Sequence, residues 1–208
     1  MNLTEHWNHV YQTNDSADVS WFQNRPTTSL DLIGTCGVAQ GDGIIDVGGG
    51  ASVLVDFLLA AGFSKLAVLD ISASALDQTK RRLGARASEV DWFAADVTQF
   101  ASPREFGLWH DRAVFHFLTE KADRQKYVET MKRTLSADGH AVISTFAIDG
   151  PEKCSRLSVC RYDATAISAE LGAGFQLLEQ VNETHVTPWN TEQRFTYFRF
   201  ARSGINSK

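Results

Sequence analysis

The sequence feature that most restricts the fold is an apolar run, Ile44–Val47, that leads directly into three glycines, Gly48, Gly49 and Gly50. A helix-length apolar stretch, Ala51–Ala61, follows. Glycines allow positive φ and let backbone N–H groups approach a ligand, and the start of a helix favours an anionic group. The pattern predicts a buried strand, a tight turn and a helix that binds something negative. A strand-to-helix connection without any ligand is the alternative.

The same strand-then-helix unit recurs along the chain. Lys65–Ile71 has the pattern of a buried strand, and Ser72 is a typical cap for the helix that follows. Strands that alternate with helices favour a parallel sheet with right-handed crossovers and helices on both faces. Further strands are predicted at Val90–Ala94, Phe106–Val114 and His140–Ala147 after a turn at Asp138-Gly139, helices at Lys121–Leu135, at Asp163–Gly172 and from Pro26, and an antiparallel pair at Phe175–Thr184 and Arg194–Ala201.

We therefore expect one α/β domain over residues 1–208, a Rossmann-like doubly wound sheet of about seven strands that closes with an antiparallel hairpin. The N-terminal segment, residues 1–40, has no strand to add to this sheet. It is predicted to form a lid over the carboxyl edge of the sheet, with Trp7, Tyr11 and Trp21 shielding the cofactor. Ordinary core packing is the alternative for these aromatic residues.

Composition and charge exclude several classes of protein. The chain is 43% hydrophobic, and its 20 Lys and Arg against 25 Asp and Glu are nowhere concentrated enough for a nucleic-acid groove. Its apolar stretches are far below the ~20 residues that cross a bilayer, and its start does not resemble a secretory signal, so a cytoplasmic protein without membrane association is expected. Cys36, Cys154 and Cys160 fit no zinc pattern, which predicts reduced thiols and no metal site.

Acidic residues stand at the ends of two consecutive predicted strands. Asp70 follows the glycine turn by about 20 residues, the spacing at which a carboxylate accepts hydrogen bonds from ribose hydroxyls. Asp96 follows the next strand, where it would accept from the exocyclic amine of adenine while Ile71 and Val97 hold the faces of the ring. Either acid alone is equally well explained as a helix cap or a surface residue. Together with the glycine turn, the two acids favour an adenosine ligand.

Asp46 separates two classes of ligand that share an adenosine. The dinucleotide fingerprint G-x-G-x-x-G requires a last glycine that Gly48-Gly49-Gly50-Ala51-Ser52-Val53 lacks. The charge of Asp46 would repel a pyrophosphate, whereas it would attract the ammonium and sulfonium of S-adenosylmethionine. The methionine carboxylate would still meet the backbone amides of the turn. S-adenosyl-L-methionine is therefore the predicted cofactor, with nicotinamide dinucleotides as the nearest competitor.

On these residues the chain resembles the class I S-adenosylmethionine-dependent methyltransferases, from Asp46 to the terminal hairpin. The stretch Phe106-Gly107-Leu108-Trp109-His110-Asp111-Arg112-Ala113, followed by Asp123–Met131, is similar to the corresponding part of the thiopurine S-methyltransferases. Glu5-His6-Trp7 and Gly150-Pro151 add to that likeness. The chain is also similar to small methyltransferase-like proteins that modify lysines on other proteins. The resemblance implies methyl transfer on this fold and leaves the acceptor open.

Methyl transfer from a sulfonium is an in-line displacement, so the protein must align a nucleophile, exclude water and manage one proton. Asp111 and Arg112 are adjacent on the fourth predicted strand, so their side chains point to opposite faces and have separate roles. Both are candidate catalytic residues, and Arg112 is expected to hold a thiolate or another anionic acceptor. His116 is the candidate proton acceptor, with a structural histidine as its alternative. His110 is expected beside the cofactor.

The preferred function is methylation of a small thiol or a similar soft nucleophile, with a small-molecule acceptor favoured over a protein. A protein lysine methyltransferase is the competing enzyme, and it should have an open, acidic channel where a small-molecule enzyme should be sealed by its lid. A non-catalytic adenosyl-binding module is the alternative from a different class. Such a module would bind the cofactor but turn over no acceptor.

Overall fold

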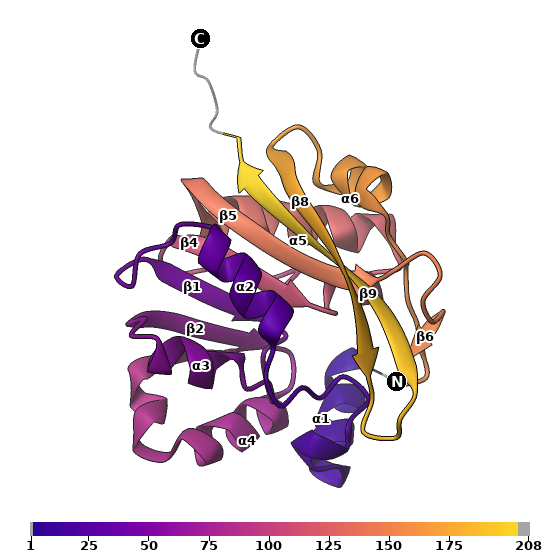
Figure 1. Ribbon diagram of the computed structural model, residues 1–208. Coiled ribbons are helices and arrows are strands. Elements are labelled where there is room, and N and C mark those ends of the chain that lie inside the picture. The colour runs from indigo at the N-terminus through magenta and orange to yellow at the C-terminus, as the bar shows by residue number, and fades with distance from the viewer. Residues whose placement is uncertain (1, 204–208) are drawn as a thin grey trace.

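The structure is a computed structural model that describes residues 2–203, and its main feature is a seven-stranded sheet in the order β3-β2-β1-β4-β5-β9-β8 (Figure 1). β1 pairs in parallel with both β2 and β4, so the strand order reverses beside β1 and opens a crevice at the carboxyl ends of these strands. β9 pairs antiparallel with β5 and β8. The predicted fold is confirmed. The strands are β1 (Gly43–Val47), β2 (Lys65–Asp70), β3 (Val90–Ala94), β4 (Phe106–Arg112), β5 (Leu135–Phe146), β8 (Phe175–Val186) and β9 (Glu192–Arg202).

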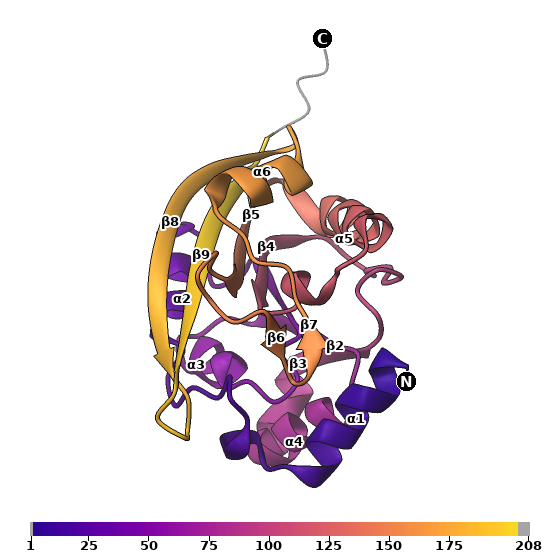
Figure 2. The same ribbon diagram turned by 90° about the vertical axis from the view of Figure 1, so that its right-hand side faces the viewer.

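Helices cover both faces of the sheet, and a small separate hairpin follows β5 (Figure 2). One hydrophobic core joins the sheet to α5 and α6, and a second core joins the other face to α2, α3 and α4. The helices are α1 (Leu3–Thr13), α2 (Thr27–Thr35), α3 (Leu54–Ala60), α4 (Ala73–Leu83), α5 (Lys121–Thr134) and α6 (Ala164–Leu171), with short 3-10 turns η1 (Ser16–Asp18), η2 (Gly84–Glu89) and η3 (Phe115–Phe117) and the hairpin β6 (Lys153–Cys154) and β7 (Leu157–Ser158).

Side chains of the central strands alternate between these two cores. Ile44 of β1 and Leu108 of β4 lie in the core that contains α2 and α3, whereas Ile45 and Trp109 lie in the core that contains α5. Because the alternation continues to the ends of the strands, neighbouring residues at the carboxyl edge face different sides of the sheet.

Two predicted boundaries near the glycine turn were wrong. α3 begins at Leu54 rather than Ala51, because the turn continues through Ser52, whose Oγ accepts a hydrogen bond from Leu54 N at 3.0 Å. β4 ends at Arg112 rather than Val114, because Ala113 has a φ of 71°, which no strand residue adopts. The early end of β4 turns the chain back over the carboxyl edge.

The fifth strand is longer than the sequence predicted. β5 begins at Leu135, immediately after α5, so the predicted turn at Asp138-Gly139 lies inside the strand. The pairing of β4 with β5 shifts its register at this point: Phe106 pairs with Leu135 and Leu108 with His140, so residues 136–139 of β5 fall in the irregularity.

The predicted lid divides into two parts. α2 packs into the core of the sheet, where Leu32 and Ile33 are each 3% exposed. α1 lies beside α4, below the carboxyl ends of the strands in Figure 1, and Gln78 Nε2 donates to Tyr11 O at 2.6 Å across that contact. The covering part is therefore α1 with the segment that follows it through Trp21.

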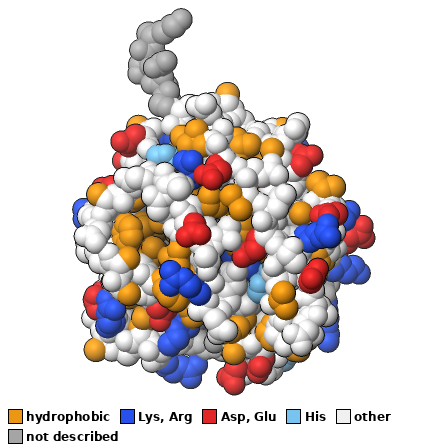
Figure 3. All heavy atoms as spheres, viewed as in Figure 1, with side chains coloured by type: hydrophobic (Ala, Val, Ile, Leu, Met, Phe, Trp, Pro, Cys, Tyr) orange, Lys and Arg blue, Asp and Glu red, His pale blue; other side chains and the backbone are white. Residues whose placement is uncertain are grey.

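Charged side chains of both signs are interspersed on the face that Figure 3 shows, and they form no continuous basic area there. Among the helices of residues 2–203, none has the length and apolar character needed to cross a membrane.

Candidate functional site

The glycine turn after β1 is built around the protein's own carboxylates. Gly48 has a φ of 70°, and its N–H donates to Leu69 O at 2.7 Å. A Cβ atom at Gly49 would overlap the carboxylate of Asp46, and one at Gly50 would overlap the carboxylate of Asp70. The room that we expected the glycines to leave for a ligand is therefore partly taken by the two acids that the sequence singled out.

Asp70 lies at the end of β2 and is held in place by the turn. Its Oδ2 accepts from Gly50 N at 3.0 Å, and its Oδ1 accepts from Ser72 N at 2.8 Å. Burial raises the pKa of Asp70 to about 6, and the two amide hydrogen bonds act in the opposite direction. The carboxylate is thus fixed before any ligand arrives, with its remaining surface toward a cavity.

Two adjoining cavities open at this carboxyl edge. The larger, about 230 Å³, is bounded by parts of the predicted adenosine site and of the lid. The smaller, about 60 Å³, lies between the glycine turn and α2. Predicted residues that line the larger cavity are Trp7, Tyr11, Trp21, Gly48, Asp70, Ile71, Asp96, Val97 and Arg112. Predicted residues that line the smaller are Tyr11, Trp21, Asp46, Gly48, Gly49, His110 and Arg112. Gly50 is in neither set, because its amide is used by Asp70.

Asp96 faces the larger cavity from the loop after β3. Its Oδ1 accepts from both the backbone N and the Oγ1 of Thr98, each at 2.8 Å. Ile71 and Val97 line the same cavity. The three residues that were predicted to contact an adenine therefore line one cavity.

Asp46 is the buried acid of the smaller cavity. His110 stands beside it in the pairing of β1 with β4, and His110 Nδ1 lies 2.7 Å from Asp46 Oδ1. The other ring nitrogen, Nε2, lies 2.9 Å from the Oγ of Ser29 on α2. Asp46 Oδ2 is buried and has no hydrogen-bond partner within residues 2–203. An unpartnered carboxylate oxygen at a cavity wall requires a donor, and the ammonium of a bound amino acid would satisfy it.

Three aromatic residues of the N-terminal segment form one wall. Trp21 Nε1 donates to the hydroxyl of Tyr11 at 3.1 Å, and Trp7 packs edge-on against Trp21 with ring centroids 5.6 Å apart. Trp7 makes a second edge contact, at 5.1 Å, with Phe117 from the loop after β4. These contacts tie the lid to the rest of the site and make it one wall of the larger cavity.

Arg112 stands between the two cavities and lines both. Its Nε donates to the hydroxyl of Tyr197 and its Nη1 to the carbonyl of Trp21, each at 2.9 Å, while the guanidinium lies 4.6 Å from the centre of the Phe195 ring. Both partners are neutral, and Nη2 is buried without a partner among the described residues. A half-buried cation therefore keeps one open donor in the site.

Asp111 does not reach either cavity. It points to the α5 side of the sheet, accepts from Val114 N at 2.8 Å and Phe115 N at 3.1 Å, and receives the hydroxyl of Tyr127 at 2.5 Å. Burial raises its pKa to about 6. The predicted separation of Asp111 from Arg112 holds, but the structure gives Asp111 a capping role in the core in place of a catalytic one.

His116 is also placed as a structural residue. It is fully buried, its Nδ1 accepts from Phe146 N at 3.4 Å, and it lines neither cavity. Burial lowers its pKa to about 3, so the ring is neutral and a weak base at neutral pH. The structural alternative fits this environment better than the predicted role of proton acceptor.

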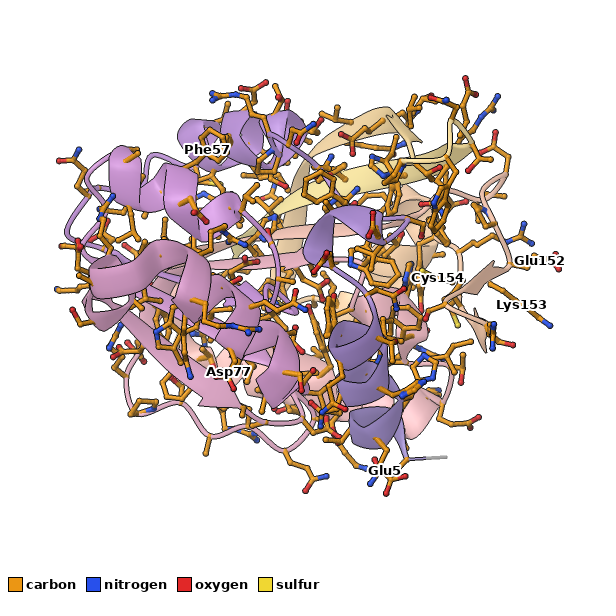
Figure 4. All side chains as sticks on the ribbon, turned by 90° about the horizontal axis from the view of Figure 1, so that it is seen from below. Glu5, Phe57, Asp77, Glu152, Lys153 and Cys154 are labelled. Carbon is orange, nitrogen blue, oxygen red and sulfur yellow. The ribbon has the colours of Figure 1, made fainter. Side chains whose placement is uncertain are left out.

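The sequence did not single out several residues that line the larger cavity. Phe195 comes from β9 and Phe117 from η3, and no local pattern distinguishes them from core residues. Cys154 on β6 is 7% exposed, and burial raises its pKa to about 12. Figure 4 shows Glu152 and Lys153 directed away from the molecule while Cys154 lies inward. Ser29, which lines the smaller cavity, was likewise missed.

Comparison with known proteins agrees with this geometry. Residues 44–139 match the family described as "Methyltransferase domain". Nodulation protein S from Rhizobium tropici is 31% identical over 87 residues, which cover 42% of this chain and span 36% of that relative's length. The prediction of a methyltransferase domain is thereby confirmed for the matched segment, and S-adenosylmethionine is the cofactor of this class of domain.

Solved structures extend the likeness to the whole fold. The N-methyltransferase NodS from Bradyrhizobium japonicum WM9, in complex with S-adenosyl-L-homocysteine, has a TM-score of 0.74 at 19% identity, covering 97% of this chain and 99% of that one. A protein described for the conversion of a disulfide bond into a thioacetal group during echinomycin biosynthesis has a TM-score of 0.79 at 16% identity, covering 99% and 94%. At these identities the likeness establishes the shared fold. The resemblance to thiopurine S-methyltransferases remains a prediction.

Proposed function

We propose that the protein transfers the methyl group of S-adenosylmethionine to a small acceptor with a thiol or a similar soft nucleophile. The observation that carries the proposal is Arg112, a half-buried guanidinium with an open donor, Nη2, beside a cavity walled by aromatic rings. Its hydrogen bonds go to a phenol and a carbonyl, so its charge is not neutralised by a direct carboxylate contact. An anionic acceptor would supply the missing partner.

The residues of the cofactor site have separate tasks in this proposal. Asp70 would accept from the ribose, Asp96 would face the adenine, and Asp46 Oδ2 would accept from the ammonium. When bound, the cofactor would supply a methyl carbon on a sulfonium for in-line attack by the acceptor's lone pair, and S-adenosylhomocysteine would leave with the electron pair of the broken carbon–sulfur bond. The protein's contribution is to hold both reactants in that line and keep water out.

The N-terminal segment favours a small acceptor over a protein side chain. Trp7, Tyr11 and Trp21 lie across the cavity, and His6 Nε2 lies 3.2 Å from the Oγ of Ser155 on the small hairpin at the opposite side. A lysine on another protein would need an open channel through this wall. The covered cavity supports the small-molecule acceptor, and the lysine alternative becomes an outcome of the test below.

Neither Asp111 nor His116, the candidate catalytic acid and base, faces the cavities, which favours an acceptor that arrives with its lone pair free. Asp111 is capped by backbone amides and His116 has a pKa of about 3. A direct hydrogen bond from Arg112 would favour the thiolate of a bound thiol. Burial raises the pKa of Cys154 to about 12 although the charge of Arg112 acts in the opposite direction, so this thiol is protonated at neutral pH and is a poor competitor for the methyl group.

An amine is the second candidate acceptor, and the relative with 31% identity favours it. That relative is Nodulation protein S, and the NodS structure that shares this fold is described as an N-methyltransferase. The charge of Arg112 would disfavour a bound ammonium and so favour the neutral amine, which is the nucleophile. Arg112 thus has a role in both reactions, but only the thiolate would bind it as an anion.

The experiment is to incubate the protein with labelled S-adenosylmethionine and two acceptor pools, low-mass metabolites and cell protein. Label in small thiols supports the proposal, and label in small amines selects the second candidate. Label in protein lysines selects the lysine methyltransferase. Binding of S-adenosylhomocysteine by calorimetry with no labelled acceptor in either pool selects the non-catalytic module. Heat from NAD with none from S-adenosylhomocysteine would overturn every methyltransferase interpretation.

A further inference from the structure

Asp46, His110 and Ser29 form a continuous buried chain of hydrogen bonds that links α2 to the smaller cavity. All three side chains line that cavity, and they are 3%, 2% and 0% exposed. Asp46 and His110 are register partners on β1 and β4, while Ser29 lies in the first turn of α2. We propose that Ser29 and His110 are positioning residues that aim the free Oδ2 of Asp46 at the α-ammonium of the bound cofactor.

One assignment of the hydrogen bonds gives both ring nitrogens of His110 a partner and leaves only Asp46 Oδ2 unpaired in this chain of three residues. His110 Nδ1 carries the proton and donates to Asp46 Oδ1, and His110 Nε2 accepts the hydroxyl proton of Ser29. The opposite tautomer would place a nitrogen lone pair 2.7 Å from a carboxylate oxygen. The carboxylate of Asp46 can only accept, so it fixes the proton on Nδ1, and Ser29 holds the ring in place from its other nitrogen without touching the carboxylate.

The orientation of Asp46 matters because its two oxygens have different surroundings. Oδ1 is held by His110, and Oδ2 is buried without any partner in residues 2–203. If the carboxylate could rotate, Oδ2 would accept a hydrogen bond from another group and would no longer face the cavity. The His110 bond prevents that rotation, and Oδ2 is kept for an incoming cation.

Ser29 also couples recognition of the cofactor to the lid. α2 directly follows the segment of Trp21, whose carbonyl accepts from Arg112. Docking of α2 is thus needed both to bring Trp21 to the larger cavity and to complete the chain to Asp46. The amino-acid end of the cofactor is recognised fully only when this helix is in place.

The inference rests on the proposed function, and a pair of ligands tests it separately. S-adenosylhomocysteine carries the ammonium, whereas 5′-methylthioadenosine keeps the adenosine and lacks the amino-acid part. In calorimetry we expect Ser29→Ala to weaken S-adenosylhomocysteine about three- to tenfold and to leave 5′-methylthioadenosine unchanged. Asp46→Asn should show the same selectivity with a larger loss for S-adenosylhomocysteine.

Thr134→Val is the matched control, because it also removes a fully buried hydroxyl but from α5 on the other face of the sheet. It should change neither affinity. The inference is overturned if Ser29→Ala weakens both ligands equally, as a general loss of packing would, or weakens neither. If the unaltered protein binds neither ligand, the proposed function itself is wrong.

Discussion

Asp70 and Asp111 are two buried aspartates at the carboxyl edge of the same sheet, one on β2 and one on β4, and their immediate surroundings are nearly identical. Asp70 is the last residue of its strand and Asp111 the last but one. Each carboxylate accepts hydrogen bonds from two backbone N–H groups of nearby turns, and burial raises the pKa of each to about 6. They differ in what meets the rest of the carboxylate. Asp70 meets a cavity, whereas Asp111 meets the hydroxyl of Tyr127.

The difference shows that burial and a perturbed pKa do not by themselves identify a site residue. The side of the sheet decides the outcome here, because α5 covers the face of Asp111 and supplies Tyr127. At Asp70 the glycine turn leaves part of the carboxylate open. The same charged group therefore stabilises the fold in one region and would bind a ligand in the other.

The largest expected effect tests whether Asp111 stabilises the fold. Asp111→Ala leaves two amides and the Tyr127 hydroxyl without an acceptor, so we expect the free energy of unfolding to fall by about 3 kcal/mol, measured in urea. Asp111→Asn keeps the size and one accepting oxygen and should lose less. If Asp111→Ala unfolds like the unaltered protein but has no turnover, Asp111 is catalytic and the comparison fails.

The ligand-binding half is tested at Asp70. Asp70→Ala should weaken S-adenosylhomocysteine by about 1.5–3 kcal/mol, because a carboxylate that accepts from ribose hydroxyls is lost. Asp70 also accepts hydrogen bonds from Gly50 N and Ser72 N, so the variant should lose about 1 kcal/mol of its free energy of unfolding. It should still fold. Calorimetry and urea unfolding measure the two effects. Unchanged affinity in a variant that is folded would remove Asp70 from the ribose site.

Arg112 sharpens the comparison because it is one residue from Asp111 and faces the other side of the sheet. Arg112→Ala should reduce kcat/KM for a thiol by roughly tenfold, most severely below the thiol's own pKa, while the affinity for S-adenosylhomocysteine changes little. Raising the pH should restore part of the turnover, because more of the thiol is then ionised in solution.

The competing interpretation is that Arg112 is structural, since it also ties Trp21 to Tyr197. That interpretation predicts a lower melting temperature and weaker cofactor binding, with no recovery at high pH. Full thiol turnover in Arg112→Ala would reject the anion-binding role.

The smallest expected effect is a pH dependence that separates the two aspartates. Asp70 would bind ribose as the carboxylate, so affinity for S-adenosylhomocysteine should fall as the pH drops through about 6, by at most about tenfold per unit. Asp70→Asn should abolish this dependence, and Asp111→Asn should preserve it. A dependence that survives in Asp70→Asn would mean that another group titrates.

The raised pKa of Asp111 acts on stability with a definite sign. The folded state holds this proton between pH 3.8 and about 6, where the unfolded chain has lost it. The part of the free energy of unfolding that comes from this shifted ionisation is therefore fully present below pH 3.8 and is lost as the pH rises through about 6. Asp111→Asn cannot ionise, so between pH 3.8 and about 6 its free energy of unfolding should decline less with pH than that of the unaltered protein.

The sequence by itself determined the order of the seven sheet strands and of the helices between them, because hydrophobic periodicity and turn residues are local, but it predicted neither α1 nor the hairpin of β6 and β7. Gly48, Asp70 and Asp96 were expected at one edge and line the larger cavity, since the carboxyl ends of parallel strands meet at one edge whatever the packing. Alternation along β4 likewise predicted that Asp111 and Arg112 would face different sides.

Only the tertiary structure decided which of those side chains meets a cavity. Alternation does not say which face α5 covers, so it did not place Asp111 under Tyr127 or bury His116 among aromatic rings. Phe195 and Ser29 reach the two cavities from segments far from the glycine turn in the sequence. The physical reason is that a strand's own residues set its periodicity, whereas burial and hydrogen-bond partners are set by elements that the chain brings back from a distance.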